Sequence, residues 1–486
     1  MGALTSKPYM FISRSWELES IESIDFFDSF GSNIKVDIRG KEILRVLPKI
    51  LESLNEEWIS DKIRFSYDSL KKQRLDVPLI KFLFKKNFYF ESKKFFPSTW
   101  EKFFMIIKDF FKLFSFSFVI GNFVDFYTLY TLKKFIIKKN PFLLKLPVFV
   151  EKNFFNDFRF NFLSPDFKNF LSCDLFIFIC VNLRLESPIL NLRIRKNILQ
   201  KKIKSFGVGC GFGFNFDFIN LGFSLKNLLF FFEGKHKLSF NFLKSKKPLI
   251  VIGSNFLKRK DFFFFNKFFL FFFKKFNYLM ISYLSLRVSD SSVFELNLNN
   301  NKIFDNFLKI DNQKNFLWVL DFDDFSFCSN FYKFSLYQGH HGDKIALKSN
   351  FILPACAPLE KNAIFINFEG RYQKSKLCSV PPLNSREDWK VLSILSIYLD
   401  LDLGFYDLFL LHKDIENYLG GFFLNIVFDK FKFFLNFTYF YKFNNFVFFP
   451  INYNYYLSDS FSKFSVVMAL ASKRFFNLSF NFKKKN

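Results

Sequence analysis

Apolar residues alternate with polar ones near the start of the chain, which predicts a small β-rich unit there. Ile34, Val36 and Ile38 occupy every second position, so their side chains would share one face of a strand. Gly31 and Gly40 bound this run, and glycine is the residue that most readily turns the chain. The polar stretch that follows is typical of loops and a short helix.

From about residue 80 onward, apolar runs of strand length alternate with lysine-spaced segments of helical length. This alternation is typical of a doubly wound α/β fold with parallel sheets. Near the end of the chain, residues 436–444 look strand-like, so a partly independent β segment is expected in the tail. The strands expected in the main part are Ser115–Ile120, Leu175–Val181, Ile203–Val208, Leu249–Ile252, Phe316–Leu320 and Phe334–Tyr337.

Two apolar stretches approach the length of a membrane span, and polar residues interrupt both. Residues 113–132 contain Asn122 and Asp125, which favours a strand that turns into a helix after Asp125. Residues 261–275 are cut by an Asn-Lys pair and are expected to form a helix packed on a sheet. Because no unbroken apolar run of about 20 residues remains, no membrane span is predicted.

The composition changes how the charge is interpreted. Phe occupies 86 of 486 positions, and the formal net charge is +26. Abundant Phe and Lys with scarce Ala indicate an A/T-rich genome of the kind found in organelles, so much of the charge is interpreted as lysine drift on a solvated surface. The alternative is a nucleic-acid face, where clustered Lys and Arg neutralise phosphates. Three stretches contain no Phe and therefore depart from this compositional bias, at residues 31–64, 179–205 and 369–404.

No residue pattern in the chain predicts a catalytic or metal site. His340 and His341 are adjacent, and neighbouring side chains on extended backbone point apart, so a structural role in a loop is expected. The six Cys never reach the spacing of iron–sulfur or zinc sites, and Cys173 and Cys180, which flank a strand, are interpreted as small buried hydrophobes. The glycine-rich residues 207–213 lack the spacing of a dinucleotide-binding loop, so a turn or linker is expected.

Three stretches of the chain carry a resemblance to one family. The first runs from Gly2 to Leu75, and the second, residues 182–196, includes Arg184 and Glu186. The third contains Gly339-His340-His341-Gly342-Asp343, Glu360-Lys361, Asn367, Glu369-Gly370-Arg371 and Arg386-Glu387-Asp388-Trp389-Lys390. In order and spacing they resemble the large iron–sulfur subunit of respiratory complex I, NADH:ubiquinone oxidoreductase, and more distantly the molybdopterin oxidoreductases.

The resemblance implies molybdopterin-oxidoreductase-like lobes with Rossmann-like parallel sheets and a small β-rich N-terminal subdomain. Residues 1–78 would be a cluster-free relative of the iron–sulfur subdomain of molybdopterin enzymes. Residues 79–335 would form the α/β lobes, and residues 336–420 would complete the core. Residues 421–486 would form a Phe- and Asn-rich tail, whose fold the resemblance does not define.

The resemblance also implies that this chain holds no cofactor, no metal and no catalytic residue. Active relatives bind a cluster through several N-terminal Cys, whereas the first Cys here is Cys173, and the usual Ser or Cys ligand to molybdenum has no counterpart. We expect no iron, molybdenum or flavin. Arg371 is predicted to hold buried hydrogen-bond acceptors. The motif residues expected to hold the fold rather than a ligand are Arg184, Glu186, Glu360, Asn367, Glu369, Gly370 and Arg371.

The resemblance implies that the chain is the second half of a split subunit. Met1 falls inside the spacer that follows the last cluster-binding Cys of the family. The clusters would lie in a separate N-terminal half, and Gly2–Phe11 would run along it. Other peripheral-arm subunits of complex I would be further partners. The chain would then be a scaffold subunit, part of an enzyme only within the complex. It would lie on the matrix side of the mitochondrial inner membrane and be encoded in the organelle genome.

Two other classes of function stay open at this point. A basic RNA-binding protein of an organelle ribosome would explain the charge of +26, but not the Glu369-Gly370-Arg371 segment. The resemblance itself predicts no nucleic-acid partner. An active molybdopterin oxidoreductase would explain the fold, and it would contain molybdenum.

Overall fold

A computed structural model describes residues 5–85, 88–139, 148–149, 167–209, 214–257, 279–296, 298, 315–322, 334–426 and 454–483. The N-terminal unit is an antiparallel three-stranded sheet made of β1 (Glu19–Ile24), β2 (Asn33–Arg39) and β3 (Glu42–Pro48). The helix α1 (Asp61–Phe65) and the 3-10 helix η2 (Ser66–Lys71) follow it. Ile34, Val36 and Ile38 are buried, and Gly31 and Gly40 have positive φ angles. The β-rich unit is therefore confirmed.

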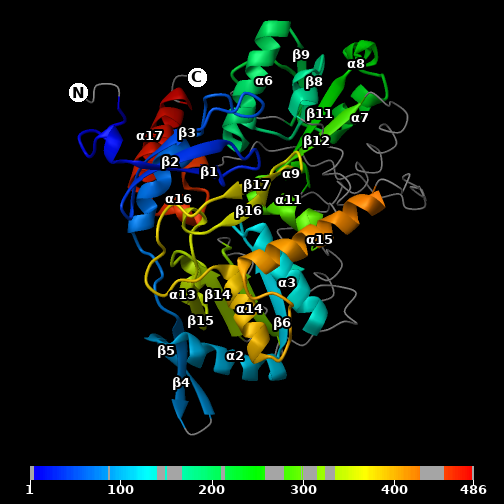
Figure 1. Cartoon of the computed structure of the whole chain (residues 1–486). Coiled ribbons are helices and arrows are strands. Elements are labelled where there is room, and N and C mark those ends of the chain that lie inside the picture. Colours follow the sequence, from blue (N-terminus) through cyan, green and yellow to red (C-terminus); the bar gives the residue numbers. More distant parts are fainter. Residues whose placement is uncertain are drawn as a thin grey trace.

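The larger lobe contains a seven-stranded sheet at the lower part of the molecule (Figure 1). Its centre is parallel, and an antiparallel hairpin, β4–β5, forms one edge. The strands in spatial order are β5 (Phe88–Pro97), β4 (Leu79–Lys85), β15 (Phe351–Pro354), β14 (Phe334–Gly339), β13 (Asn315–Leu320), β6 (Ser115–Ile120) and β7 (Val148–Phe149).

Helices cover one face of this sheet because alternate strand residues supply an apolar surface there. Phe118, Trp318 and Leu336 share that face and belong to one buried cluster with the helices. The opposite face, which includes Val319 and Tyr337, packs against α13 (Lys344–Lys348). The covering helices are α2 (Trp100–Leu113), α3 (Phe126–Lys139) and α14 (Asp388–Tyr398), and α15 (Leu408–Ile426) crosses over α3 (Figure 1).

The smaller lobe is built on a five-stranded, fully parallel sheet in the order β10 (Ile219–Gly222), β9 (Lys204–Val208), β8 (Leu175–Ile179), β11 (Pro248–Gly253) and β12 (Met280–Leu284). All five residues of β8 are buried, as expected for a central strand covered on both faces. The helices of one layer are α4 (Phe167–Leu171), α5 (Leu183–Glu186) and α6 (Pro188–Lys201); those of the other are α7 (Leu225–Phe232), α8 (Ser239–Lys244), α9 (Ser254–Leu257) and α11 (Val288–Glu295).

The predicted α/β class and its parallel sheets are confirmed. Each of the six strands expected from the sequence is present within one or two residues of its predicted ends, and α3 begins directly after Asp125. The sequence pattern did not predict β4, β5, β7, β10, β12 or β15, nor the short hairpin of β16 (Ala363–Ile366) and β17 (Tyr372–Ser375). The expected helix at 261–275 and strand at 436–444 lie outside the described residues.

The described end of the tail is helical, so the expectation of a β segment is wrong for that part. It consists of η7 (Tyr455–Leu457), α16 (Ser460–Lys463) and α17 (Val466–Lys483), which lie beside the N-terminal unit (Figure 1). Asp68 accepts hydrogen bonds from the first amides of α17, at Val466 (3.0 Å) and Val467 (3.3 Å). Within the part of the chain that the structure describes, no helix has the length and hydropathy needed to cross a membrane.

Candidate functional site

The parallel strands of the larger lobe end together at one edge of the sheet. Gly121 follows β6, Asp321 follows β13, His340 follows β14 and Ala355 follows β15. Their backbones continue the pairing past the strand ends: Gly121 N donates to Leu320 O at 2.8 Å. The carboxyl edge of an open parallel sheet is where proteins of this architecture place ligands. This carboxyl edge is therefore the candidate site.

A buried ion cluster occupies the candidate site. The Nζ of Lys361 lies 2.7 Å from Asp125 Oδ1 and 3.3 Å from Asp388 Oδ2. Lys361 is only 3% exposed, and burial disfavours its charged form, but the two carboxylates outweigh this effect and keep the pKa of Lys361 above its ordinary value. One lysine thus holds two carboxylates that could not be buried without it.

Hydrogen bonds fix each carboxylate of this cluster to a different element. Asp388, the first residue of α14, accepts from Gln338 Nε2 at 2.6 Å, and Gln338 in turn accepts from Trp318 Nε1 at 3.1 Å. Asp125 precedes α3 and accepts from Thr128 Oγ1 at 2.8 Å. The cluster therefore joins β13, β14, α3 and α14 at the point where their ends converge.

The two adjacent histidines lie next to this cluster and contact each other. Their Nδ1 atoms are 2.5 Å apart, so the expectation that the side chains point apart is wrong; β14 ends at Gly339, and strand alternation no longer applies beyond it. His341 Nε2 lies 3.0 Å from the carbonyl of Ser69 and donates to it, which leaves His341 Nδ1 to accept from His340. Burial lowers the pKa of His341 to about 4 and also lowers the pKa of His340 well below its ordinary value, so the pair is neutral at physiological pH.

A second buried ion pair completes the edge. Arg74 holds Glu360 with two parallel bonds of 2.6 and 2.5 Å and also donates to the carbonyl of His340 at 3.1 Å. Glu360 Oε2 accepts from Ala357 N at 2.9 Å as well. The sequence singled out Glu360 but not Arg74, whose role depends on a partner 286 residues away.

The C-terminal helices close the candidate site from the outside. Asp459 pairs with buried Lys62 and accepts from Asn122 Nδ2 at 3.0 Å. The ring of Phe461 contacts that of His340, with centroids 5.8 Å apart, and Phe464 stacks on His341 at 4.8 Å. The histidines are thus covered by protein.

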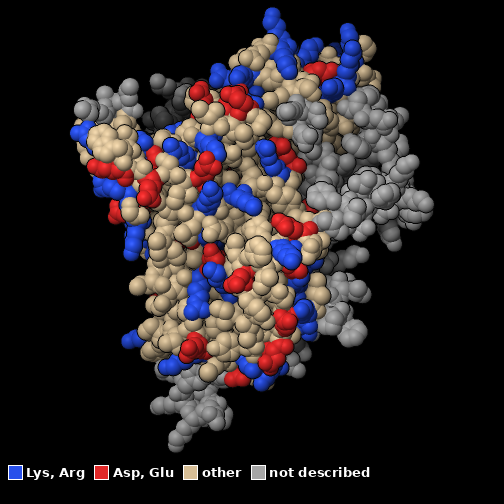
Figure 2. All heavy atoms as spheres, in the orientation of Figure 1, with Lys and Arg blue, Asp and Glu red and all other residues tan. Residues whose placement is uncertain are grey.

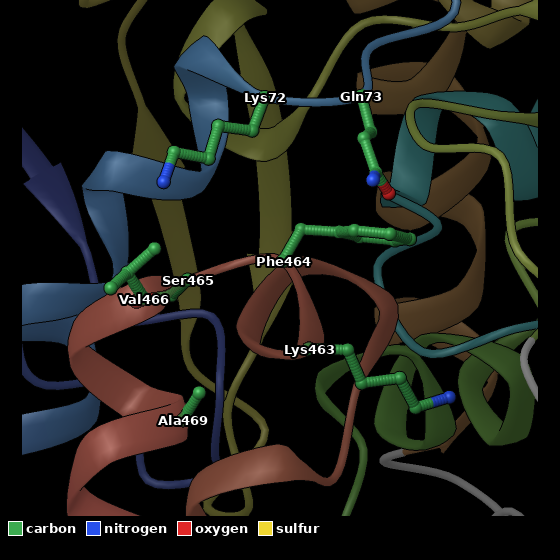
Figure 3. A pocket seen from close by; sticks show the side chains of 7 residues that line it. All are labelled: Lys72, Gln73, Lys463, Phe464, Ser465, Val466 and Ala469. Carbon is green, nitrogen blue, oxygen red and sulfur yellow. The ribbon is translucent and has the colours of Figure 1, made fainter.

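A crevice of about 410 Å³ runs along the outer side of Phe464 (Figure 3). The close-up shows Gln73 and the ring of Phe464 approaching each other, with Lys72 and Lys463 at separate ends. Lys463 pairs with Asp343 at 3.0 Å. The crevice therefore borders the covered histidines rather than opening onto the ion cluster. Its lining residues are Lys72, Gln73, Lys463, Phe464, Ser465, Val466 and Ala469.

The carboxyl edge of the smaller sheet is covered differently, by aromatic rings. Phe30 of the N-terminal unit stacks on Phe368 with centroids 5.7 Å apart and meets Phe167 edge-on at 5.5 Å. Beneath them, Asp28 accepts from Ser187 Oγ at 3.2 Å and from Phe30 N at 3.2 Å. Burial is the main cause that raises the pKa of Asp28 to about 8.

The loop that follows β16 links this aromatic cover to the larger lobe. Asn367 Oδ1 accepts from Glu369 N (3.1 Å) and Arg371 N (2.8 Å), and Gly370 has a φ of 84°, a value that glycine adopts without strain. Phe368 N donates to Ser29 O at 2.8 Å. The loop therefore fixes a junction between three units of the fold.

The other motif residues contribute unequally. Glu369 Oε2 accepts from Phe167 N at 3.4 Å, and Glu186 is buried and accepts from Asn182 N at 3.1 Å. Arg184 and Arg371 are exposed. The prediction that Arg371 holds buried acceptors is therefore wrong, because its guanidinium lies on the surface of this chain.

Sequence comparisons place the fold in a known class. A model described as molybdopterin oxidoreductase matches residues 74–398, and a model described as the 4Fe-4S domain of NDSU1/NuoG-like NADH-ubiquinone oxidoreductases matches residues 18–68. Among solved structures, acetylene hydratase from Pelobacter acetylenicus is similar at 8% identity over 78% of this chain and 69% of that one, with a TM-score of 0.47, which is too weak to bear on function.

Curated relatives make the class more specific. The 75 kDa subunit of NADH-ubiquinone oxidoreductase from Reclinomonas americana is 37% identical over 83% of this chain, and that from Acanthamoeba castellanii is 34% identical over 99%. The mitochondrial 78 kDa subunit of Candida albicans is 35% identical over 84%. The chain belongs to this family of 75 kDa-type subunits. It spans 61%, 70% and 56% of these three relatives.

The residues present do not fit a 4Fe-4S cluster in the segment that the second model matches. Such clusters are held by Cys thiolates, and residues 18–68 contain neither Cys nor His. The buried carboxylate of Asp25 is already engaged, by Phe27 N at 3.0 Å and Ser60 Oγ at 2.9 Å. In the described part of the chain, no group of three or more His, Cys, Asp or Glu has an arrangement suited to a metal ion.

Proposed function

We propose that the chain is a scaffold subunit of the peripheral, matrix-facing arm of mitochondrial respiratory complex I. It supports the electron path from NADH to ubiquinone and carries out no chemistry of its own. Family membership supports the assignment to this complex, since the relatives are named as subunits of NADH-ubiquinone oxidoreductase and one is named as mitochondrial. The iron–sulfur clusters of the path would be held by protein outside these 486 residues.

The observation that carries the proposal is the filling of the carboxyl edge by the chain's own side chains. Lys361 forms ion pairs with Asp125 and Asp388 there, and Arg74 pairs with Glu360 beside them. Residues that already satisfy each other offer no donor set to a cofactor. The edge that binds ligands in related architectures serves here to lock the elements of the lobe together.

Two measurements test this proposal. Mass spectrometry of purified complex I should find the chain in stoichiometric amount, and it should also show whether the cluster-bearing part is a separate polypeptide. Metal analysis of the chain purified alone should give less than one iron or molybdenum per ten chains. Stoichiometric molybdenum would instead support an active molybdopterin enzyme, and stoichiometric iron would support a cluster in the N-terminal unit.

A further inference from the structure

The smaller lobe carries an excess of positive charge, as do residues 77–173 with sixteen Lys and Arg against seven Asp and Glu, whereas the N-terminal unit is balanced. Residues 174–257 contain thirteen Lys and Arg against four Asp and Glu, whereas residues 5–76 contain twelve against thirteen. Because the excess is shared, only the placement of these lysines on the fold can indicate a binding surface.

The lysines of the smaller lobe gather at the amino edge of its sheet, opposite the aromatic cover. In the register of the parallel strands, Leu175 at the start of β8 pairs with Lys204 on one side and with Pro248 on the other. Two lysine clusters therefore lie on either side of the start of β8. We name them the basic edge, which consists of Lys201, Lys202, Lys204, Lys244, Lys246 and Lys247, all exposed.

Among the residues that the structure describes, no lysine of the basic edge forms an ion pair. The carboxylate of Asp174 is directed at the backbone beside it, where it accepts from Lys246 N at 2.6 Å and Lys247 N at 2.9 Å. Lys201 donates to the carbonyl of Leu171 and Lys204 to the amide oxygen of Asn241. Figure 2 shows blue side chains projecting from this end of the molecule, where α6 and α8 lie in Figure 1.

Large apolar side chains are exposed among these lysines. Phe240 and Leu243 lie on one face of α8 and are 67% and 59% exposed, and Leu199 at the end of α6 is 60% exposed. Apolar anchors within a charged rim are the usual anatomy of a protein–protein interface. The lysines of the basic edge and these apolar side chains together match that anatomy.

Resting on the proposed function, we propose that the basic edge, with Phe240 and Leu243 at its centre, binds an acidic surface of another protein subunit in the same complex. Opposite charges would steer that subunit and fix its orientation, and the two apolar side chains would enter a complementary apolar depression. A protein partner is favoured over a lipid surface or RNA because the family to which this chain belongs is named for subunits of a multi-protein enzyme.

Zero-length cross-linking of intact complex I tests the pairing directly. A carbodiimide joins a Lys amine to a carboxylate only where the two are in contact. Amide bonds from Lys202, Lys244, Lys246 or Lys247 to Asp or Glu of one other polypeptide are expected. Acetylation of these lysines should also be at least about tenfold slower in the complex than in the separated chain. Equal acetylation in both, without cross-links, would overturn the proposal.

A variant with these four lysines changed to Ser measures the contribution of the charge. At raised salt it should retain about tenfold less of the cross-linked polypeptide than the wild type. The matched control changes Lys35, Lys41, Lys374 and Lys376, which are also exposed, and should retain it fully.

The remaining outcomes separate this inference from the proposed function. If wild-type chain but not the four-Ser variant co-sediments with vesicles of one-third phosphatidylglycerol, or binds a labelled 20-nucleotide RNA at physiological salt, the partner is a lipid or a nucleic acid and the inference fails. If the chain is missing from complex I, the proposed function fails as well. If it is present with unprotected lysines, only the inference fails.

Discussion

The two sheets of this chain close the same edge by different physical means. In the larger lobe the carboxyl edge is filled by buried ion pairs around Lys361, and in the smaller lobe it is covered by the rings of Phe30, Phe167 and Phe368. A buried charge cluster depends on every member, because the loss of one leaves an uncompensated charge. An aromatic cover loses stability in proportion to the area removed. The comparison predicts an abrupt response in one lobe and a graded one in the other.

The largest effect is expected for Lys361→Met. The substitution leaves Asp125 and Asp388 buried without their cation, at a cost of about 3–5 kcal/mol in the free energy of unfolding. Urea unfolding followed by tryptophan fluorescence measures the change. Lys390→Met is the matched control, since Lys390 pairs with Glu387 at the surface and should cost less than about 1 kcal/mol. Equal effects of the two substitutions would contradict the charge cluster as a stabilising element.

Substitutions at Phe368 should show the graded response. We expect Phe368→Ala to cost about 3 kcal/mol and Phe368→Leu about 1 kcal/mol, because the ring is buried against Phe30 and the smaller side chains fill less of the space. The same urea titration applies. A Leu variant as unstable as the Ala variant would mean that ring geometry, rather than buried area, controls this edge.

A smaller effect that depends on pH is expected at Asp28. Burial raises its pKa from 3.8 to about 8, so the folded protein keeps this proton at pH values where the unfolded chain has released it. The contribution of Asp28 to stability is therefore complete below pH 4 and is lost as the pH rises toward 8. Asp28→Asn should flatten this decline, so that its unfolding midpoint relative to the wild type is higher at pH 8 than at pH 5. An unchanged difference between the two pH values would place the proton elsewhere.

The smallest effect is expected for Arg371→Ala. Although it lies in the junction loop, its side chain is exposed, and surface substitutions of this kind usually stay within about 0.5 kcal/mol. Asn367→Ala is the contrasting variant, because it removes the acceptor of two backbone amides, and a cost of about 1–3 kcal/mol is expected. A larger loss at Arg371 than at Asn367, measured in the assembled complex, would show that Arg371 contacts a partner subunit.

The amino-acid sequence by itself determined the class of the fold and the positions of its strongest elements. Strands such as Phe316–Leu320 are continuous apolar runs bounded by polar residues, and this local pattern suffices because a central parallel strand is buried on both faces. The resemblance of the Phe-free windows identified the family. Short strands such as β15 escaped, because few residues form them and their stability comes from neighbours distant in the sequence. The helical end of the tail was also missed.

The tertiary structure alone decided which charges meet. Nothing local marks Lys361 as the partner of Asp125, which is 236 residues away, or Arg74 as the partner of Glu360. Arg371, singled out by its motif, lies at the surface, whereas the unremarked Gln338 lies at the centre of the charged edge. Hydrophobic patterns in the sequence indicate which residues of a segment are buried, because burial depends on each side chain separately. Ion pairs between remote segments depend on the packing of whole elements, and that information exists only once the chain has folded.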